Sequence, residues 1–160
     1  MLPGNLPINR GEVKPVKILL VEDSRALRLS NEHALRSAGH EVICAEDGEA
    51  ALNCAREHKP DLILLDLLLP RMNGLEVLTR LKHGRSTANI PVIALSGLSE
   101  RNRQKLIDAG AEEYVEKSAI LTDKGVNRLP QVLAELISRI NRRRGTPSSA
   151  SLAAASGSES

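Results

Sequence analysis

The stretch that decides the fold is DLILLDLLLPRMNG, residues 61–74. Its opening run, Asp61–Leu65, is almost continuously apolar, which is typical of a strand covered on both faces of a parallel sheet. Asp66 follows the run directly, and the turn-forming residues Pro70 and Asn73-Gly74 then separate it from a helical pattern. A polar group at the end of such a strand faces the crevice in which open α/β sheets bind their ligands.

Three other apolar runs also stop at polar side chains. Glu22 and Asp23 follow KILLV, Ser96 ends the segment IPVIALS, and Lys117 closes EEYVEK. Because the carboxyl ends of parallel strands share one edge of a sheet, we expect these groups to converge with Asp66. Three carboxylates, a hydroxyl and an ammonium in one crevice suggest a divalent cation beside a phosphoryl group. The pattern therefore indicates phosphate chemistry on the protein itself.

Each of these polar groups has an ordinary explanation when it is considered alone. An acidic pair that opens a helix often only complements the helix dipole. Asp66 and Ser96 are turn formers, and a lysine such as Lys117 is usually a solvated charge. Four such coincidences at one edge of one sheet are much less plausible than a shared site.

Strand and helix signals alternate along the chain. The expected strands are Lys17–Val21, Glu41–Ala45, Asp61–Leu65, Ile90–Leu95 and Glu113–Glu116. The expected helices cover residues 24–38, 48–58, 74–82 and 100–109, and a last helix is capped by Asn127. Five successive strand–helix units predict a parallel sheet with helices on both faces, because crossover connections are right-handed.

The length of 160 residues is about that of one domain. Residues 1–15 are rich in Pro and Gly and predict a flexible leader, whereas residues 143–160 are rich in Ser and Ala and predict a disordered tail. We therefore expect one folded domain over residues 16–142, with no effector domain after it.

Composition argues against several classes of partner. The net charge is only +2, so no basic face for nucleic acid is expected, and Tyr114 is the only aromatic residue available to stack on a base. No apolar run approaches the roughly 20 residues of a membrane helix, so no membrane association is expected. Cys44 and Cys54 form no CxxC pair, which favours a reducing cytoplasm.

Taken together, LLVEDS, DLILLDLLLPRMNG, IPVIALSG and AGAEEYVEK resemble the receiver domain of two-component response regulators, in the stand-alone form found among chemotaxis regulators. The resemblance covers about residues 16–142. It implies a flavodoxin-like, doubly wound α/β fold with five helices. It also implies five parallel strands in the order 2-1-3-4-5, with the site at the carboxyl edge.

The resemblance assigns a role to each acidic residue of the crevice. Asp66 matches the phosphoacceptor, which attacks the phosphoryl group of a phosphohistidine on a partner histidine kinase. Glu22, Asp23 and Asp66 match the carboxylates that hold Mg²⁺, a cation that prefers oxygen ligands and keeps several waters. The main-chain carbonyl of Leu68 matches the remaining protein ligand.

The resemblance also implies catalytic and switch residues. Lys117 matches the lysine that pairs with a phosphoryl oxygen, and Ser96 matches the hydroxyl residue that hydrogen-bonds another. Tyr114 occupies the aromatic position that rotates inward when the residue matching Ser96 moves toward the phosphate. We hypothesise that Ser96 and Tyr114 couple the site to a face formed by the fourth helix, the fifth strand and the fifth helix.

The sequence departs from the family pattern after Lys117. Ser118 stands where the family has a proline, often with a cis bond. A cis bond before a residue other than proline costs about 3–4 kcal/mol, so we expect a trans bond here. The segment Ser118–Val126 is also longer than usual.

Two leucines bear on the lifetime of a phosphoryl group. Leu68 and Leu98 lie two residues after Asp66 and Ser96, beside the path of an attacking water. Neither side chain can orient that water by hydrogen bonding. We therefore predict slow self-dephosphorylation.

These features predict a single-domain response regulator that receives a phosphoryl group from a histidine kinase and changes its binding to a downstream effector. It would be no enzyme toward other substrates and would catalyse only its own phosphoryl transfer and autodephosphorylation. The alternative is a phosphorelay shuttle that passes the group from Asp66 to a histidine phosphotransfer protein. A third possibility is a flavodoxin-like cofactor or hydrolase enzyme, and the lack of aromatic residues to flank a flavin argues against its flavin version. A receiver-fold module that is never phosphorylated is disfavoured because every catalytic position is filled.

Overall fold

The structure, a computed structural model, describes residues 14–97 and 103–145. It contains two compact units, of which Pro15–Pro130 is the larger and carries the sheet. The described part of the other unit is Lys14 and residues 131–145, which make up most of the final helix. The expected leader and tail fall almost entirely outside the described residues.

The five expected strands are all present. β1 spans Lys17–Val21, β2 Glu41–Ala45, β3 Leu62–Asp66, β4 Val92–Ser96 and β5 Glu113–Glu116. They form one parallel sheet in the order β2-β1-β3-β4-β5. The predicted flavodoxin-like fold, including its strand order, is confirmed.

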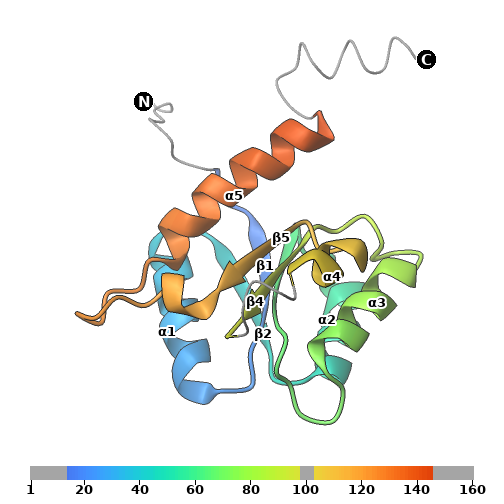
Figure 1. The fold of residues 1–160 in the computed structure, drawn as a ribbon, viewed down its shortest axis with the longest axis horizontal. Helices are drawn as coiled ribbons and strands as arrows, with labels where there is room; N and C mark the ends of the chain where they lie inside the picture. The colour runs from blue at the N-terminus through green and yellow to red at the C-terminus, as the bar shows by residue number, and fades with distance from the viewer. Residues whose placement is uncertain (1–13, 98–102, 146–160) are drawn as a thin grey trace. The chain divides into compact units, whose positions relative to one another are not determined.

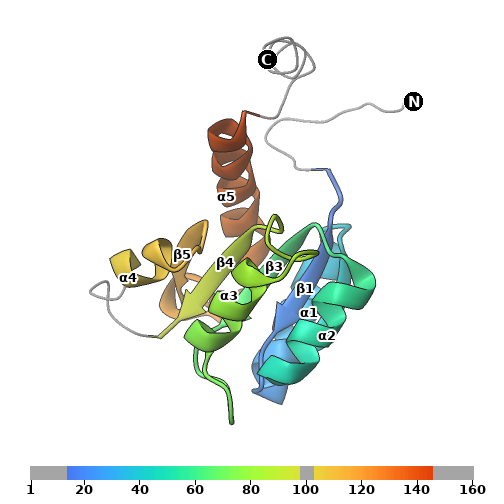
Figure 2. The same ribbon diagram turned by 90° about the vertical axis from the view of Figure 1, so that its right-hand side faces the viewer.

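Helices connect successive strands (Figure 1). Their bounds are Arg25–Ser37 for α1, Gly48–His58 for α2, Gly74–His83 for α3, Arg103–Asp108 for α4 and Leu129–Arg144 for α5. Around the sheet, α1 lies on one face and α2 and α3 lie on the other (Figures 1 and 2). The predicted start of the fourth helix, Glu100, lies outside the described residues. Within the described ranges, no helix combines the length and apolarity needed to cross a bilayer.

Side-chain oxygens cap the N-termini of three of these helices. Ser24 Oγ accepts a hydrogen bond from the Leu27 N–H at 3.4 Å, and Asp47 Oδ1 accepts one from the Ala50 N–H at 2.8 Å. The Asn73 side chain accepts from the Glu76 N–H at 2.9 Å. Because each cap satisfies a backbone donor that the first helical turn leaves unpaired, it fixes where the strand-to-helix loop ends. Two of these loops carry the predicted site residues.

The core explains why the strand ends are held firmly. Residues of β3 are buried along its whole length, as its apolar sequence predicted. Alternate residues of the central strands face α2 and α3 and join the helix side chains in one buried cluster, which includes Leu19, Val21, Ile63, Leu65, Val77, Leu78 and Leu106. The close packing of the sheet therefore holds the polar residues at its carboxyl edge in fixed positions.

The strand register brings the four polar ends together. Val21 lies beside Leu65, so Glu22 follows at the level of Asp66. Asp66 lies beside Leu95, one residue before Ser96, and Ser96 in turn lies beside Glu116, one residue before Lys117. The convergence expected from the sequence thus follows from parallel pairing without any irregularity in the strands.

Both cysteines are free and half-buried. Burial raises the pKa of the Cys44 thiol to about 11 and also raises the pKa of Cys54. Both groups therefore remain protonated at neutral pH and are poor nucleophiles.

Candidate functional site

Three carboxylates meet at the carboxyl edge of the sheet. Glu22 and Asp23 follow β1, and Asp66 ends β3. One oxygen of each lies within 4.8 Å of an oxygen of the other two. Glu22 and Asp66 are each only 1% exposed, whereas Asp23 is exposed. The cluster therefore has a buried base and one solvent-facing member.

Lys117, the first residue after β5, points its ammonium into this cluster. Its Nζ lies 3.1 Å from Asp66 Oδ2 and 3.2 Å from Glu22 Oε1. The ammonium of Lys117 thus bridges the two buried carboxylates. This contact joins the ends of β1, β3 and β5 in one site.

The buried charges shift one another's ionisation. Burial and, next, the charge of Asp66 raise the pKa of Glu22 to about 7, although Lys117 opposes this rise. Burial disfavours the charged form of Lys117, but its hydrogen bond to Asp66 and the charges of Asp66 and Glu22 raise the pKa of the ammonium overall. The pair of carboxylates therefore holds more negative charge than one lysine neutralises well.

This donor set fits a hard divalent cation. The buried Glu22 Oε1 accepts no hydrogen bond of good geometry from any described group, even though Nζ of Lys117 is nearby. A buried oxygen without a hydrogen bond is costly, and a cation would satisfy it. Because Mg²⁺ prefers carboxylate oxygens and retains several waters, two buried ligands and the exposed Asp23 suit it.

Two other predicted residues, Ser96 and Leu68, lie at the same edge. Ser96 is fully buried at the end of β4. Leu68 is 59% exposed in the loop after β3, and its N–H donates to Asp66 Oδ1 at 3.1 Å. The role of its carbonyl oxygen as a ligand stays a prediction. Tyr114 is half-buried on β5 beside Ala94, and Leu98 lies outside the described residues.

Sequence reasoning missed Arg28, which fixes the acidic loop. Its Nη1 donates to the main-chain carbonyl oxygens of Glu22 at 3.0 Å and Asp23 at 3.4 Å. The guanidinium also lies 3.7 Å from Glu46. In the sequence this arginine is indistinguishable from any charge on a helix surface, so only the structure reveals its contact with the loop.

The loop after Asp66 is fixed by close packing and by an ion pair. A Cβ on Gly74 would collide with the backbone of Leu67, and the Gly74 N–H donates to the Leu67 carbonyl at 3.0 Å. Arg71 adopts a left-handed conformation (φ 66°) and pairs with Asp47 Oδ2 at 2.8 Å. The start of α3 and the cap of α2 thus together hold the segment that follows the proposed phosphoacceptor.

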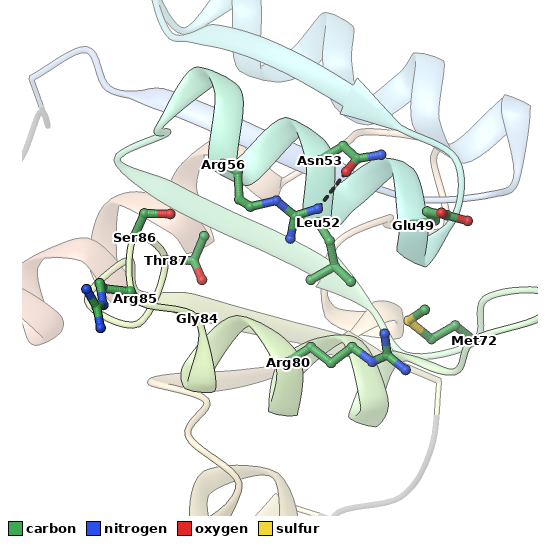
Figure 3. A pocket seen from close by; sticks show the side chains of 10 residues that line it. All are labelled: Glu49, Leu52, Asn53, Arg56, Met72, Arg80, Gly84, Arg85, Ser86 and Thr87. Carbon is green, nitrogen blue, oxygen red and sulfur yellow. Dashed lines mark hydrogen bonds between the residues drawn. The ribbon is translucent and has the colours of Figure 1, made fainter.

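A separate groove of about 610 Å³ lies between α2, α3 and the loop that follows α3 (Figure 3). Its lining includes Leu52, Arg56, Met72, Arg80, Arg85 and Thr87. Arg56 and Arg80 belong to the last turns of their helices, where arginine commonly complements the dipole. The groove contains no member of the carboxylate cluster, and we do not assign it to the site.

A sequence model of the response regulator receiver domain matches residues 18–124. The chain belongs to this family. Receiver domains interact with histidine kinases and downstream effectors, and they generally bind Mg²⁺ at an acidic site. In this receiver domain, the acidic cluster is Glu22, Asp23 and Asp66.

Relatives include proteins both longer than this receiver domain and similar to it in length. Response regulator MprA of Mycolicibacterium vanbaalenii is 37% identical over 137 residues, which cover 83% of this chain and 53% of MprA. The chain thus spans about half the length of the MprA relatives. Polar-differentiation response regulator DivK of Brucella anthropi is 36% identical over 104 residues, which cover 64% of this chain and 85% of DivK.

Solved structures of receiver domains agree with the fold. The chemotaxis response regulator CheY4 of Vibrio cholerae has a TM-score of 0.67 and 28% identity, covering 79% of this chain and 99% of CheY4. The Mn²⁺-bound form of response regulator Rcp1 has a TM-score of 0.64 and 32% identity, covering 74% of this chain and 91% of Rcp1.

Proposed function

We propose that this receiver domain accepts a phosphoryl group on Asp66 from the phosphohistidine of a histidine kinase, with Mg²⁺ as cofactor. The observation that carries the proposal is the ammonium of Lys117, 3.1 Å from Asp66 and 3.2 Å from Glu22 within a cluster of three carboxylates. A lysine so placed can pair with an oxygen of the incoming phosphoryl group. The chain would act on no other substrate and would catalyse only its own phosphorylation and dephosphorylation.

The proposed step exchanges one bond to phosphorus for another. A carboxylate oxygen of Asp66 attacks the phosphorus, a P–O bond forms, and the P–N bond to the kinase histidine breaks. The electron pair of that bond leaves with the imidazole nitrogen, which takes a proton from solvent. Lys117 and the hydroxyl of Ser96 each stabilise a phosphoryl oxygen by hydrogen bonding.

Mg²⁺, held by Glu22, Asp23 and Asp66 with the carbonyl of Leu68, would neutralise charge on the phosphoryl oxygens. The protein's own contribution is to hold these groups in place. The Arg28 contacts fix the main chain of the acidic pair. Hydrogen bonding from the Leu68 N–H orients the Asp66 carboxylate.

The direct test is incubation of the whole chain with acetyl phosphate, followed by intact mass spectrometry. With Mg²⁺ the chain should gain one phosphoryl group, and with EDTA in place of Mg²⁺ it should gain none. No gain with any small phosphodonor, or an equal gain in EDTA, would refute the proposed chemistry.

A phosphorelay shuttle is the second candidate, because the same site would serve it. The two functions differ in where the group goes next. Transfer of label from the phosphorylated chain to a histidine phosphotransfer protein would favour the shuttle. Retention of the label, together with tighter binding to an effector, would favour the terminal regulator.

Leu68 should control how long the phosphoryl group persists. Its main-chain N–H donates to Asp66, and its exposed side chain cannot orient an attacking water by hydrogen bonding. We expect Leu68→Asn to shorten the phosphoryl lifetime about fivefold, because a single hydrogen bond to the water is worth about 1 kcal/mol. Leu68→Ala should leave the lifetime nearly unchanged. Release of inorganic phosphate after removal of the donor measures both variants, and faster decay in the alanine variant alone would contradict the expectation.

We further propose that phosphorylation switches partner binding through α4, β5 and α5, with Ser96 and Tyr114 as the coupling residues. Tyr114 packs against the buried cluster and lies beside Ala94, two residues before Ser96. Only Leu106 is buried in α4, so this helix is weakly held within its unit. We expect the ring resonances of Tyr114 to shift when a beryllium fluoride mimic of the phosphoryl group is added with Mg²⁺. Identical ring signals with and without the mimic would eliminate the coupling.

A further inference from the structure

The connection that follows Lys117 is a small folded element. A 3-10 turn, Lys117–Ala119, leads into a hairpin in which Leu121 and Asn127 form an antiparallel bridge. The Thr122 N–H donates to the Val126 carbonyl at 3.0 Å, and the left-handed Gly125 (φ 79°) closes the turn. The described residues contain no cis peptide bond, so the Lys117–Ser118 bond is trans, as expected. Something other than a proline must hold this connection in place.

Asn127 joins the hairpin to α1 with its whole side chain. The amide nitrogen donates to Ser30 Oγ at 3.0 Å and to Asn31 Oδ1 at 2.8 Å, and the amide oxygen accepts from the Leu129 N–H at 2.9 Å. Asn31 is only 6% exposed. Loss of the contact would leave the amide oxygen of the buried Asn31 without this donor, so the contact is costly to break.

The Asn127 contact and two residues of the proposed site line the same small cavity. A cavity of about 30 Å³, room for one or two waters, is lined by Glu22, Lys117, Ser30, Asn31 and Asn127, among others. Its walls therefore include both the ion pair that faces Asp66 and the residues that attach the hairpin to α1. A shift of the hairpin would therefore also change the position of Lys117, which lines the same cavity.

We propose that Asn127 is a positioning residue, which attaches the β5–α5 connection to α1 and thereby holds the Lys117 ammonium beside Asp66. The assignment rests on the proposed function of the site. In this chain, the position of Lys117 would therefore depend on the contact between Asn127 and α1. Asn127 touches neither the phosphoryl group nor the carboxylates.

The test compares Asn127→Ala with the wild-type chain in acetyl phosphate at saturating Mg²⁺. We expect phosphorylation to be slower by about tenfold to a hundredfold, the loss that follows a small misplacement of a catalytic group. The Mg²⁺ concentration for half-maximal rate should stay the same, because the carboxylates belong to other loops. Asn127→Asp keeps the side-chain shape and the acceptor for Leu129 but loses both donations to α1, so it should slow the reaction similarly.

A control separates positioning from general destabilisation. Thr87 is 3% exposed, and its hydroxyl donates to the Leu81 carbonyl at 2.6 Å in the loop before β4, at the opposite edge of the sheet. Thr87→Val should lower the melting temperature but leave the phosphorylation rate unchanged. Equal rates in the wild type, Asn127→Ala and Asn127→Asp would overturn the proposal. An inert wild type would instead refute the function of the site.

A second measurement needs neither a phosphodonor nor Mg²⁺. The Arg128 N–H donates to the Ile120 carbonyl, and the Ile120 N–H donates to the Lys117 carbonyl at 3.1 Å. Both amides should exchange hydrogen faster in Asn127→Ala than in the wild type, while the amides of β3 stay protected. Unchanged exchange at Ile120 and Arg128 would show that Asn127 does not hold the connection.

Discussion

Asp66→Asn should leave the chain unable to gain a phosphoryl group from acetyl phosphate at any Mg²⁺ concentration. An amide is not a nucleophile toward phosphorus under these conditions, and its loss of charge also removes a ligand from the acidic cluster. The substitution nearly preserves the side-chain shape, and its oxygen can still accept from the Leu68 N–H. Intact mass spectrometry measures the result directly.

Asp61→Asn is the matched control. Asp61 precedes the same strand, and its Oδ2 accepts from the Lys17 N–H at 2.8 Å at the opposite edge of the sheet. This variant loses one carboxylate but should gain a phosphoryl group as the wild type does. A phosphoryl group on Asp66→Asn, mapped by peptide analysis to Asp23 or another residue, would show that the nucleophile has been misassigned.

Without Mg²⁺, the contribution of Glu22 to stability should depend on pH in the opposite sense to that of most carboxylates. The pKa of Glu22 rises from an ordinary value of 4.5 to about 7 in the folded chain. Between these values the folded state binds more protons at Glu22 than the unfolded state does, so the contribution of Glu22 to stability is fully present below about pH 4.5 and is lost as the pH rises through about 7. At about 1.4 kcal/mol for each pKa unit, the contribution of Glu22 to this fall is at most about 3–4 kcal/mol.

Glu22→Gln should flatten this dependence and raise the free energy of unfolding at pH 8 in EDTA. The glutamine still offers an acceptor to the Ser24 N–H, and Lys117 keeps Asp66 as its partner. Glu46→Gln, at a side chain that is 72% exposed, should retain the wild-type pH dependence. Urea unfolding at several pH values measures all three chains, and equal slopes for Glu22→Gln and the wild type would contradict the assignment.

Mg²⁺ should restore the stability that ionised Glu22 costs. Binding to the folded chain alone adds about 2.7 kcal/mol when free Mg²⁺ is about one hundred times its dissociation constant. Because protons compete for the same carboxylates, the gain should be larger at pH 8 than at pH 5. Glu22→Gln, which removes a ligand, should gain less.

The strands and most helices could be predicted because local chemistry and tertiary structure agree there. Apolar runs ended at the polar residues that now lie at the edge, and Ser24, Asp47 and Asn73 cap the helices that they open. The bounds of β3 and β4 shifted by one or two residues. In β4 the predicted start included Pro91, which lacks an N–H, and the regular strand begins after it at Val92.

The contacts that support the site could not be predicted, because their partners are distant in sequence. Asn127 was expected only to cap the last helix. Its oxygen accepts from the Leu129 N–H, but its nitrogen reaches α1, ninety-six and ninety-seven residues away. Arg28 gave no signal for the same reason. The periodicity and polarity of the sequence locate the ends of helices and strands. Hydrogen bonds between segments that are distant in sequence depend on how the helices and strands pack in the folded chain.

The burial of β3 on both faces has a consequence for partly opened states of the molecule. Asp66 terminates a strand that is buried along its whole length, and the neighbours of this strand on both sides, β1 and β4, belong to the same sheet. Peripheral segments such as the short α4 should open at a much lower free energy than this strand. A chain in which only α4 has opened should therefore keep Asp66 in position as the nucleophile.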